Sequence, residues 1–142
     1  MRKLVFILFF VISCLSYNKQ KIINEKEIII DHWEVMYNAI CKTESEFDHL
    51  AYNKTTGAAG ILQLKPIYVK EVNRILGKNI YTNKDRYDKD KCREMFEIYQ
   101  NYYNPNKDIN TAILLHYNGP NIKGNKWYLK RVLNNLNYQN KL

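Results

Sequence analysis

The stretch DHWEVMYNAICKTESEFD, residues 31–48, decides the fold class. Its apolar residues recur at i, i+4, i+7 and i+8, which is the spacing of one face of an α-helix: Trp33, Tyr37, Ile40 and Cys41. Asp31 has the side chain of an N-cap, and Glu44 continues the apolar face at i+11. The sequence therefore predicts a helix that begins at Asp31 and carries Glu44 on its buried side, near its C-terminus.

The position of Glu44 has an electrostatic consequence. A carboxyl on the inward side of a helix C-terminus loses hydration and lies near the negative end of the helix dipole. Because both effects disfavour the charged form, we expect the pKa of Glu44 to lie above its ordinary value. Glu46 is about 200° further round the helix, so we expect it to face solvent.

Similar patterns continue along the chain and predict further helices. Their ranges are 58–64, 67–76, 88–104, 108–118 and 127–136, with a polar loop over 79–87. Asp88 and Asp108 are suited to cap the helices that follow them, and Gly77 is suited to end the helix before it. Since no segment shows the alternation of a strand, the prediction is an all-α architecture with short helices around one core.

Length and composition agree with one compact domain. The chain has 142 residues, of which 46% are hydrophobic and 25% charged, so a folded core is expected and two full domains are excluded. The formal net charge of +8 favours polyanionic partners such as nucleic acid, anionic lipid or an acidic wall polymer. The basic residues are scattered rather than grouped in a block, which is typical of solvated helix faces.

The N-terminal residues MRKLVFILFFVISCLS follow a secretory pattern. Two basic residues precede nine apolar ones, Leu4 to Ile12, and a helix over this run is too short to cross a bilayer. Ser13 and Cys14 then follow as in a bacterial lipobox, which makes Cys14 a candidate for lipidation. Ordinary cleavage after Ser13 or Ser16 is the alternative.

These features predict three parts: a signal peptide over residues 1–13, a tether over 14–30 and the folded domain over 31–142. The protein is therefore expected to be exported to the periplasm or cell envelope, where a lipid at Cys14 would attach it to a membrane. Export also argues against nucleic acid as the partner.

Cys41 and Cys92 remain as an even pair in an exported protein, where they can form a disulfide. Both also lie among apolar residues at helical spacing, where buried thiols are common, so both alternatives stay open. The three histidines are far apart in the sequence, and no metal site is predicted.

Three short segments carry the chemistry: KTESEFD (42–48), GAAGILQLKP (57–66) and AILLHYNGP (112–120). In this order they resemble the three motifs of the soluble-type lytic transglycosylase domain, within the goose-lysozyme-like superfamily. The family pattern has a helix-ending Glu-Ser, then Gly-Ala-x-Gly-Leu-Met-Gln-x-x-Pro, then Ala-Tyr-Asn-x-Gly-Pro. The likeness extends over residues 31–136 and implies a single lysozyme-like helical domain.

The resemblance implies cleavage of the β-1,4 bond between N-acetylmuramic acid and N-acetylglucosamine in peptidoglycan. Glu44 matches the family's acid/base, which protonates the glycosidic oxygen and then lets the C6 hydroxyl close a 1,6-anhydro ring. A lysozyme-type hydrolysis is the first alternative, and it uses a second carboxylate, for which Glu46 and Asp48 are the local candidates. A wall-binding module without activity is the second alternative.

The resemblance also assigns candidate substrate-binding residues. Gln63 matches a glutamine that faces the cleft, and Tyr117 matches a tyrosine whose hydroxyl points toward the acid/base or the muramyl acetamide. Asn118 matches its structural or substrate-binding neighbour. Ser45 matches the residue after the acid, where it is expected to fix the helix end or the rotamer of Glu44.

Some positions depart from the family pattern. Leu62 replaces a methionine, and Asn53 stands where the family often has a serine, so we treat Asn53 as a candidate to hold the acetamide. His116 replaces a small residue and is expected to pack or to lie at the rim rather than to react. The aromatic residues of 99–103 and 127–128 are assigned to core packing, with sugar stacking as the alternative.

The expected partners follow from these assignments. They are peptidoglycan glycan strands, a membrane through the lipid at Cys14, and a secretion or conjugation apparatus as a further candidate. The resemblance implies no cofactor, and the chain is expected to act as a monomer.

Overall fold

The computed structural model describes residues 32–122 and 125–139, with the backbone alone described for 137–139. By its contacts the chain divides into two units, Met1–Glu34 and Val35–Leu142. The account below concerns the second unit. The predicted signal peptide, the tether, Cys14 and the cap at Asp31 lie outside the described residues.

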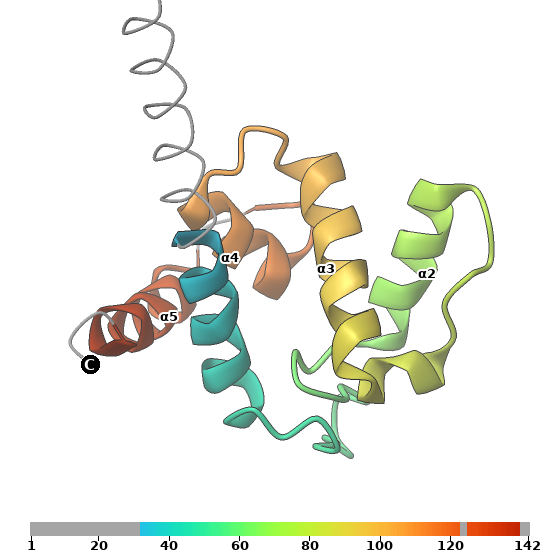
Figure 1. Cartoon of the computed structure of the whole chain (residues 1–142), viewed down its shortest axis with the longest axis horizontal. Coiled ribbons are helices and arrows are strands. Elements are labelled where there is room, and N and C mark those ends of the chain that lie inside the picture. The colour runs from blue at the N-terminus through green and yellow to red at the C-terminus, as the bar shows by residue number, and fades with distance from the viewer. Residues whose placement is uncertain (1–31, 123–124, 140–142) are drawn as a thin grey trace, which may run out of the picture. The chain divides into compact units, whose positions relative to one another are not determined.

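The described residues fold into helices and turns (Figure 1). After a helix over residues 32–45, the elements are α2 (Pro66–Leu76), the 3₁₀ helix η1 (Asn83–Tyr87), α3 (Lys89–Tyr103), α4 (Ile109–Asn118) and α5 (Lys126–Gln139). Over the described part of the chain there is no strand, only isolated bridges of single residues. The prediction of an all-α architecture is confirmed for these residues.

Helix caps set the boundaries where the sequence predicts them. The Asp88 side chain accepts from the backbone N–H groups of Asp90 and Lys91 at the start of α3, and Asp108 accepts from Thr111 at the start of α4. At the end of α2, Gly77 adopts φ 65°, a left-handed conformation that glycine takes at little cost. Each of these boundaries lies within one or two residues of the predicted one.

The predicted helix over 58–64 is wrong. This segment is a tight turn in which Ala59 and Leu64 exchange backbone hydrogen bonds of 3.0 and 2.9 Å. Gly60 and Gln63 adopt positive φ values of 77° and 47°, which a right-handed helix does not allow. The apolar run that resembles a helix face is instead a turn buried on several sides, with Ala58, Ala59, Ile61, Leu62 and Leu64 in the core.

The core forms around α3. This helix packs against α2, η1 and α4, and α4 in turn packs against α5; Figure 1 shows α3 between α2 and α4. Large side chains from every part of the unit are fully buried there: Met36, Ile40, Leu62, Val72, Met95, Phe96, Ile113 and Val132. Burial of this apolar surface is the main term that favours the fold.

Cys41 and Cys92 are not joined by a disulfide. Both side chains are fully buried in the core, so the alternative of buried thiols describes the structure. The Cys92 thiol lies 3.0 Å from the carbonyl oxygen of Arg86, to which it donates. Burial raises the pKa of Cys92 to about 12, which makes it a poor nucleophile near neutral pH.

A buried arginine ties η1 to the 57–64 turn. Nη1 of Arg86 donates to the carbonyl oxygens of Gly57 and Leu64, at 2.8 Å each, and Nε donates to Asn83 at 3.0 Å. The residue is only 6% exposed. Because hydrogen bonds to a buried charged group are strong, Arg86 fixes the turn that carries Gln63.

None of the helices described here is long and apolar enough to span a membrane.

Candidate active site

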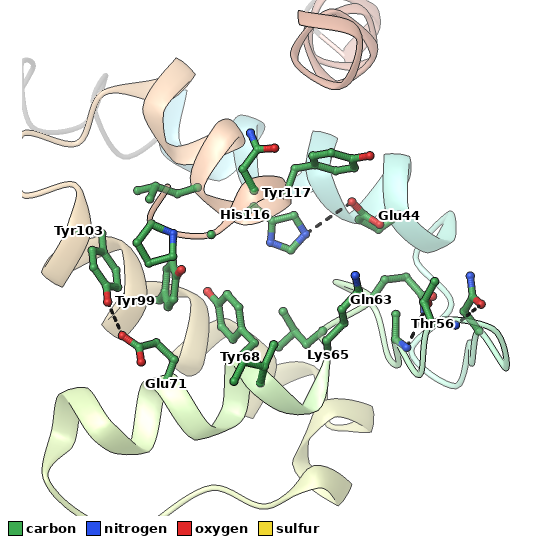
Figure 2. A pocket seen from close by; sticks show the side chains of 18 of the residues that line it. Glu44, Thr56, Gln63, Lys65, Tyr68, Glu71, Tyr99, Tyr103, His116 and Tyr117 are labelled. Carbon is green, nitrogen blue, oxygen red and sulfur yellow. Dashed lines mark hydrogen bonds and ion pairs between the residues drawn. The ribbon is translucent and has the colours of Figure 1, made fainter. Parts of the chain in front are cut away.

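All three motif segments border one cavity of about 1020 Å³ (Figure 2). The helix over 32–45 contributes Glu44, and the 53–65 segment contributes Asn53, Thr56 and Gln63. The opposite wall comes from α2 and α3, which contribute Tyr68, Glu71, Tyr99 and Tyr103. The end of α4 closes the cavity with His116, Tyr117 and Asn118. Segments that are distant in the sequence thus meet at one place.

Glu44 borders this cavity, and its side chain is 20% exposed. The hydroxyl of Tyr128 donates a hydrogen bond of 2.5 Å to Oε1 of Glu44. Nε2 of His116 lies 3.6 Å from the same oxygen, which is within ion-pair range but too long for a hydrogen bond. One carboxylate oxygen therefore has neighbours from both α4 and α5.

The expected rise in the pKa of Glu44 is wrong. Burial does raise the pKa of Glu44, and it is the largest single effect. Three other groups lower the pKa: His116 by its contact and its charge, Tyr128 by its hydrogen bond, and Arg131 by its charge. Together they outweigh burial, so the net shift is downward. The helix pattern predicts the burial and the helix dipole. It contains no information on these three groups, which come from helices far along the chain.

Tyr128 is a site residue that sequence reasoning missed. It was assigned to core packing, with sugar stacking as the alternative, and it is indeed only 2% exposed. Its hydroxyl nevertheless reaches a residue 84 positions earlier. Its ring stacks on that of Tyr117, with centroids 4.4 Å apart and planes at 25°. No motif marks Tyr128, because its contact with Glu44 depends on how α5 packs.

Tyr117 and Asn118 both line the cavity. Tyr117 is 48% exposed and covers the ring of Tyr128, and the hydroxyl that bonds Glu44 belongs to Tyr128. Nδ2 of Asn118 is buried and has no hydrogen-bond partner within the described residues. Since unsatisfied buried donors are rare, Asn118 is suited to donate to a ligand. The binding roles of both residues stay predictions.

Gln63 lines the cavity in a conformation set by the turn. Nε2 of its side chain donates to the carbonyl oxygens of Ala51 and Gly60, at 3.2 and 3.0 Å. The two amide hydrogens are thus occupied, so the amide oxygen is the group that Gln63 can offer to a sugar hydroxyl or acetamide N–H.

Asn53 and Ser45 hold the backbone around the cavity. Oδ1 of Asn53 accepts from the N–H groups of Thr55 and Thr56, at 3.0 and 3.1 Å, so this side chain organises its own loop at the cavity edge. The hydroxyl of Ser45 donates to the carbonyl oxygen of Ile61 at 2.8 Å. Ser45 therefore joins the end of the helix that carries Glu44 to the turn that carries Gln63.

A second carboxylate lines the cavity, and it is neither of the predicted ones. Glu46 and Asp48 are exposed and do not border the cavity. Glu71 on α2 does, at the other end from Glu44 in Figure 2. Arg74 donates two hydrogen bonds to Glu71, at 2.8 and 2.6 Å, and the hydroxyl of Tyr103 donates a third. Hydrogen bonding from Arg74 lowers the pKa of Glu71, so this group is held as a carboxylate.

Within residues 32–122 and 125–139, no three histidine, cysteine or acidic side chains gather as metal ligands. The cavity thus offers two carboxyl groups, Glu44 and Glu71, each with polar neighbours.

The part of the chain that the structure describes is thus a helical domain with a partly buried carboxyl group in a large polar and aromatic cavity. The chain matches the family model described as Transglycosylase SLT domain over residues 21–130. It is therefore a member of the SLT transglycosylase family, whose general function is of the lytic transglycosylase type and whose substrate is peptidoglycan. Neither the comparison with curated proteins nor that with solved structures gave a match.

Proposed function

We propose that this protein is a lytic transglycosylase that cleaves the β-1,4 bond between N-acetylmuramic acid and N-acetylglucosamine, with Glu44 as its single acid/base. The observation that carries the proposal is the position of Glu44, partly buried in a cavity bordered by all three motif segments. The products are 1,6-anhydromuropeptides.

The proposed reaction has two proton transfers through one carboxyl group. Protonated Glu44 first donates to the glycosidic oxygen, and the bond from that oxygen to C1 of the muramyl sugar breaks. The resulting carboxylate then removes the proton of the C6 hydroxyl, whose oxygen bonds to C1 and closes the anhydro ring. The group thus ends protonated, as it began, and no water is consumed.

Tyr128 supports both steps by holding the carboxyl. A hydroxyl that donates to Oε1 fixes the orientation of the side chain and stabilises the charged form after the first transfer. A glycan that fills the cavity excludes water and adds to the burial of Glu44. Because burial is the effect that raises this pKa, substrate binding favours uptake of the proton that the first step needs.

A pH dependence follows from the lowered pKa of Glu44 in the free protein. The pH profile of kcat/KM reports groups of the free enzyme, and the required acid is a minority form above that pKa. We expect kcat/KM on soluble glycan strands to fall with rising pH above the midpoint of Glu44, with a limiting slope of about tenfold per pH unit. Circular dichroism at each pH checks that the fold persists. A rate that rises with pH over this range would contradict Glu44 as the acid.

The proposal is tested by the products formed from purified sacculi. Mass spectrometry should find muropeptides that carry anhydro ends, without the added water of hydrolysis. Reducing ends would instead identify a lysozyme-type muramidase, a second candidate that the presence of Glu71 in the same cavity favours. Binding to sacculi without any soluble product would identify a wall-binding module.

We also propose that the protein is exported and anchored to a membrane by a lipid at Cys14. The support is the order of basic leader, apolar run and Ser13-Cys14 in the sequence. We expect labelled palmitate to be incorporated into the full chain and lost in Cys14→Ser, which should also move the protein from the membrane to the soluble fraction. Equal labelling of both chains would contradict the anchor.

A further inference from the structure

His116 lies beside the proposed acid/base. The last turns of α4 place it one residue before Tyr117, and Figure 2 shows its ring directed toward Glu44. Its side chain is 4% exposed, and Nε2 is 3.6 Å from Oε1 of Glu44. Of the two expectations for His116, to pack or to lie at the rim, packing describes its side chain, although the residue as a whole is partly exposed.

The remaining surroundings of the imidazole are mainly aromatic. The ring of Tyr68 on α2 lies 6.5 Å away, edge-on, and the ring of Phe96 on α3 lies 6.3 Å away. Nδ1 of His116 is buried and has no hydrogen-bond partner among residues 32–122 and 125–139. The Tyr68 hydroxyl is likewise buried without a partner there, and burial raises its pKa, so it stays neutral. The charged group that faces His116 is thus Glu44.

Glu44 has two other polar neighbours, both on α5. Tyr128 donates its hydroxyl hydrogen, and its own pKa is raised by burial, so it stays a neutral donor. Arg131 acts through its charge and lies over the ring of Trp127. His116 is the ionisable side chain that α4 places beside Glu44.

A buried imidazole and carboxylate each favour the charged form of the other. We propose that His116 is a positioning residue for Glu44, and that the two form a buried pair in which the charge of His116 controls whether Glu44 holds its proton. The inference rests on the proposed function only for its kinetic consequence.

The pair favours the second half of the proposed reaction. There Glu44 must be a carboxylate that removes the C6 proton, and a neighbouring imidazolium stabilises that state. The same charge disfavours the first half of the reaction, in which Glu44 donates its proton, because it lowers the fraction of protonated Glu44 in the free protein. Loss of the imidazole should therefore change the midpoint of Glu44.

The direct test is a carbon NMR titration of the Glu44 carboxyl in the full chain, with the signal assigned by its absence in Glu44→Gln. In His116→Gln we expect the midpoint of Glu44 to rise by about one pH unit, because the amide keeps a donor but cannot carry the charge. His49→Gln, a histidine away from the cavity, is the matched control and should leave the midpoint unchanged. An unchanged midpoint in His116→Gln, or an equal shift in the control, would overturn the pair.

Kinetics provide the second readout. The midpoint of the fall in kcat/KM with rising pH should move upward in His116→Gln by the same amount as the NMR midpoint. In His116→Ala, which also removes the side chain that holds Glu44 in place, kcat should fall about tenfold further than in His116→Gln. His116→Asn replaces His116→Gln if thermal unfolding shows that the latter is not folded.

The two readouts separate the possible failures. A shifted NMR midpoint in a chain that releases no muropeptides would support the pair and contradict the proposed function. An unchanged NMR midpoint in a chain that does release anhydromuropeptides would contradict the pair and leave the proposed function standing.

Discussion

Glu44→Gln should reduce the release of muropeptides from sacculi by about a thousandfold while the protein stays folded. The amide cannot donate a proton to the glycosidic oxygen or take one from the C6 hydroxyl, so both steps lose their group at once. Its carbonyl oxygen can still accept the hydrogen bond from Tyr128, which preserves the local packing. Initial rates of muropeptide release, measured by chromatography, give the size of the loss, and thermal unfolding checks the fold.

Two further variants make this result specific. Glu46→Gln changes an exposed glutamate two residues along the chain that does not border the cavity, and it should retain the full rate. Glu71→Gln removes the other carboxylate of the cavity, and a loss below about tenfold is expected if one carboxyl group does the chemistry. Equal, thousandfold losses in Glu44→Gln and Glu71→Gln would contradict the single-acid reaction and favour a two-carboxylate hydrolase.

Gly60→Ala should prevent stable folding. A Cβ at this position would lie 1.5 Å from the carbonyl oxygen of Arg86 and 2.7 Å from its carbonyl carbon, and both are backbone atoms that cannot turn aside. The residue also has φ 77°, which adds strain for alanine. The turn and η1 would have to separate, at the expense of the hydrogen bonds of Arg86. We expect a loss of about 4 kcal/mol or more in the free energy of unfolding, a large part of the stability of a small domain.

Gly57→Ala is the matched control for this clash. Gly57 has a similar φ of 71°, but a Cβ there would meet no atom within 4 Å. It therefore carries the backbone strain without the overlap, and a loss of about 1 kcal/mol is expected. Urea unfolding of the two variants and the unchanged chain measures the difference. If Gly60→Ala and Gly57→Ala were equally stable, the close approach of the turn to Arg86 would not be a feature of the protein in solution.

Much of the helical fold could be predicted because its signals are local. Asp88 and Asp108 cap the helices they precede, and Gly77 ends α2. The 58–64 segment is the exception. Its apolar residues are buried because the segment is enclosed by other parts of the chain, so hydrophobic periodicity gave the wrong element. Positive φ at Gly60 and Gln63 depends on that enclosure, and the sequence alone does not reveal it.

The candidate site, too, could be predicted from the sequence only in part. The three motifs predict that Glu44, Gln63 and Tyr117 belong together, and all three line one cavity. The sign of the pKa shift of Glu44 could not be predicted, because it depends on groups from α4 and α5 whose contacts arise from packing. Glu71 was missed because an acidic residue in the middle of a helix is usually solvated, and no sequence signal places this one at the cavity.

The contribution of α5 to Glu44 has a practical consequence for anyone who trims this protein. All three signature segments end by residue 120, and the family match stops at residue 130. A fragment cut before Lys126 would keep every signature yet lose the Tyr128 phenol that donates to Glu44, and one cut at residue 130 would lose the guanidinium of Arg131. The smallest fragment that keeps the neighbours of Glu44 is therefore longer than the recognisable motifs, and truncations should be designed around α5 rather than around sequence signatures.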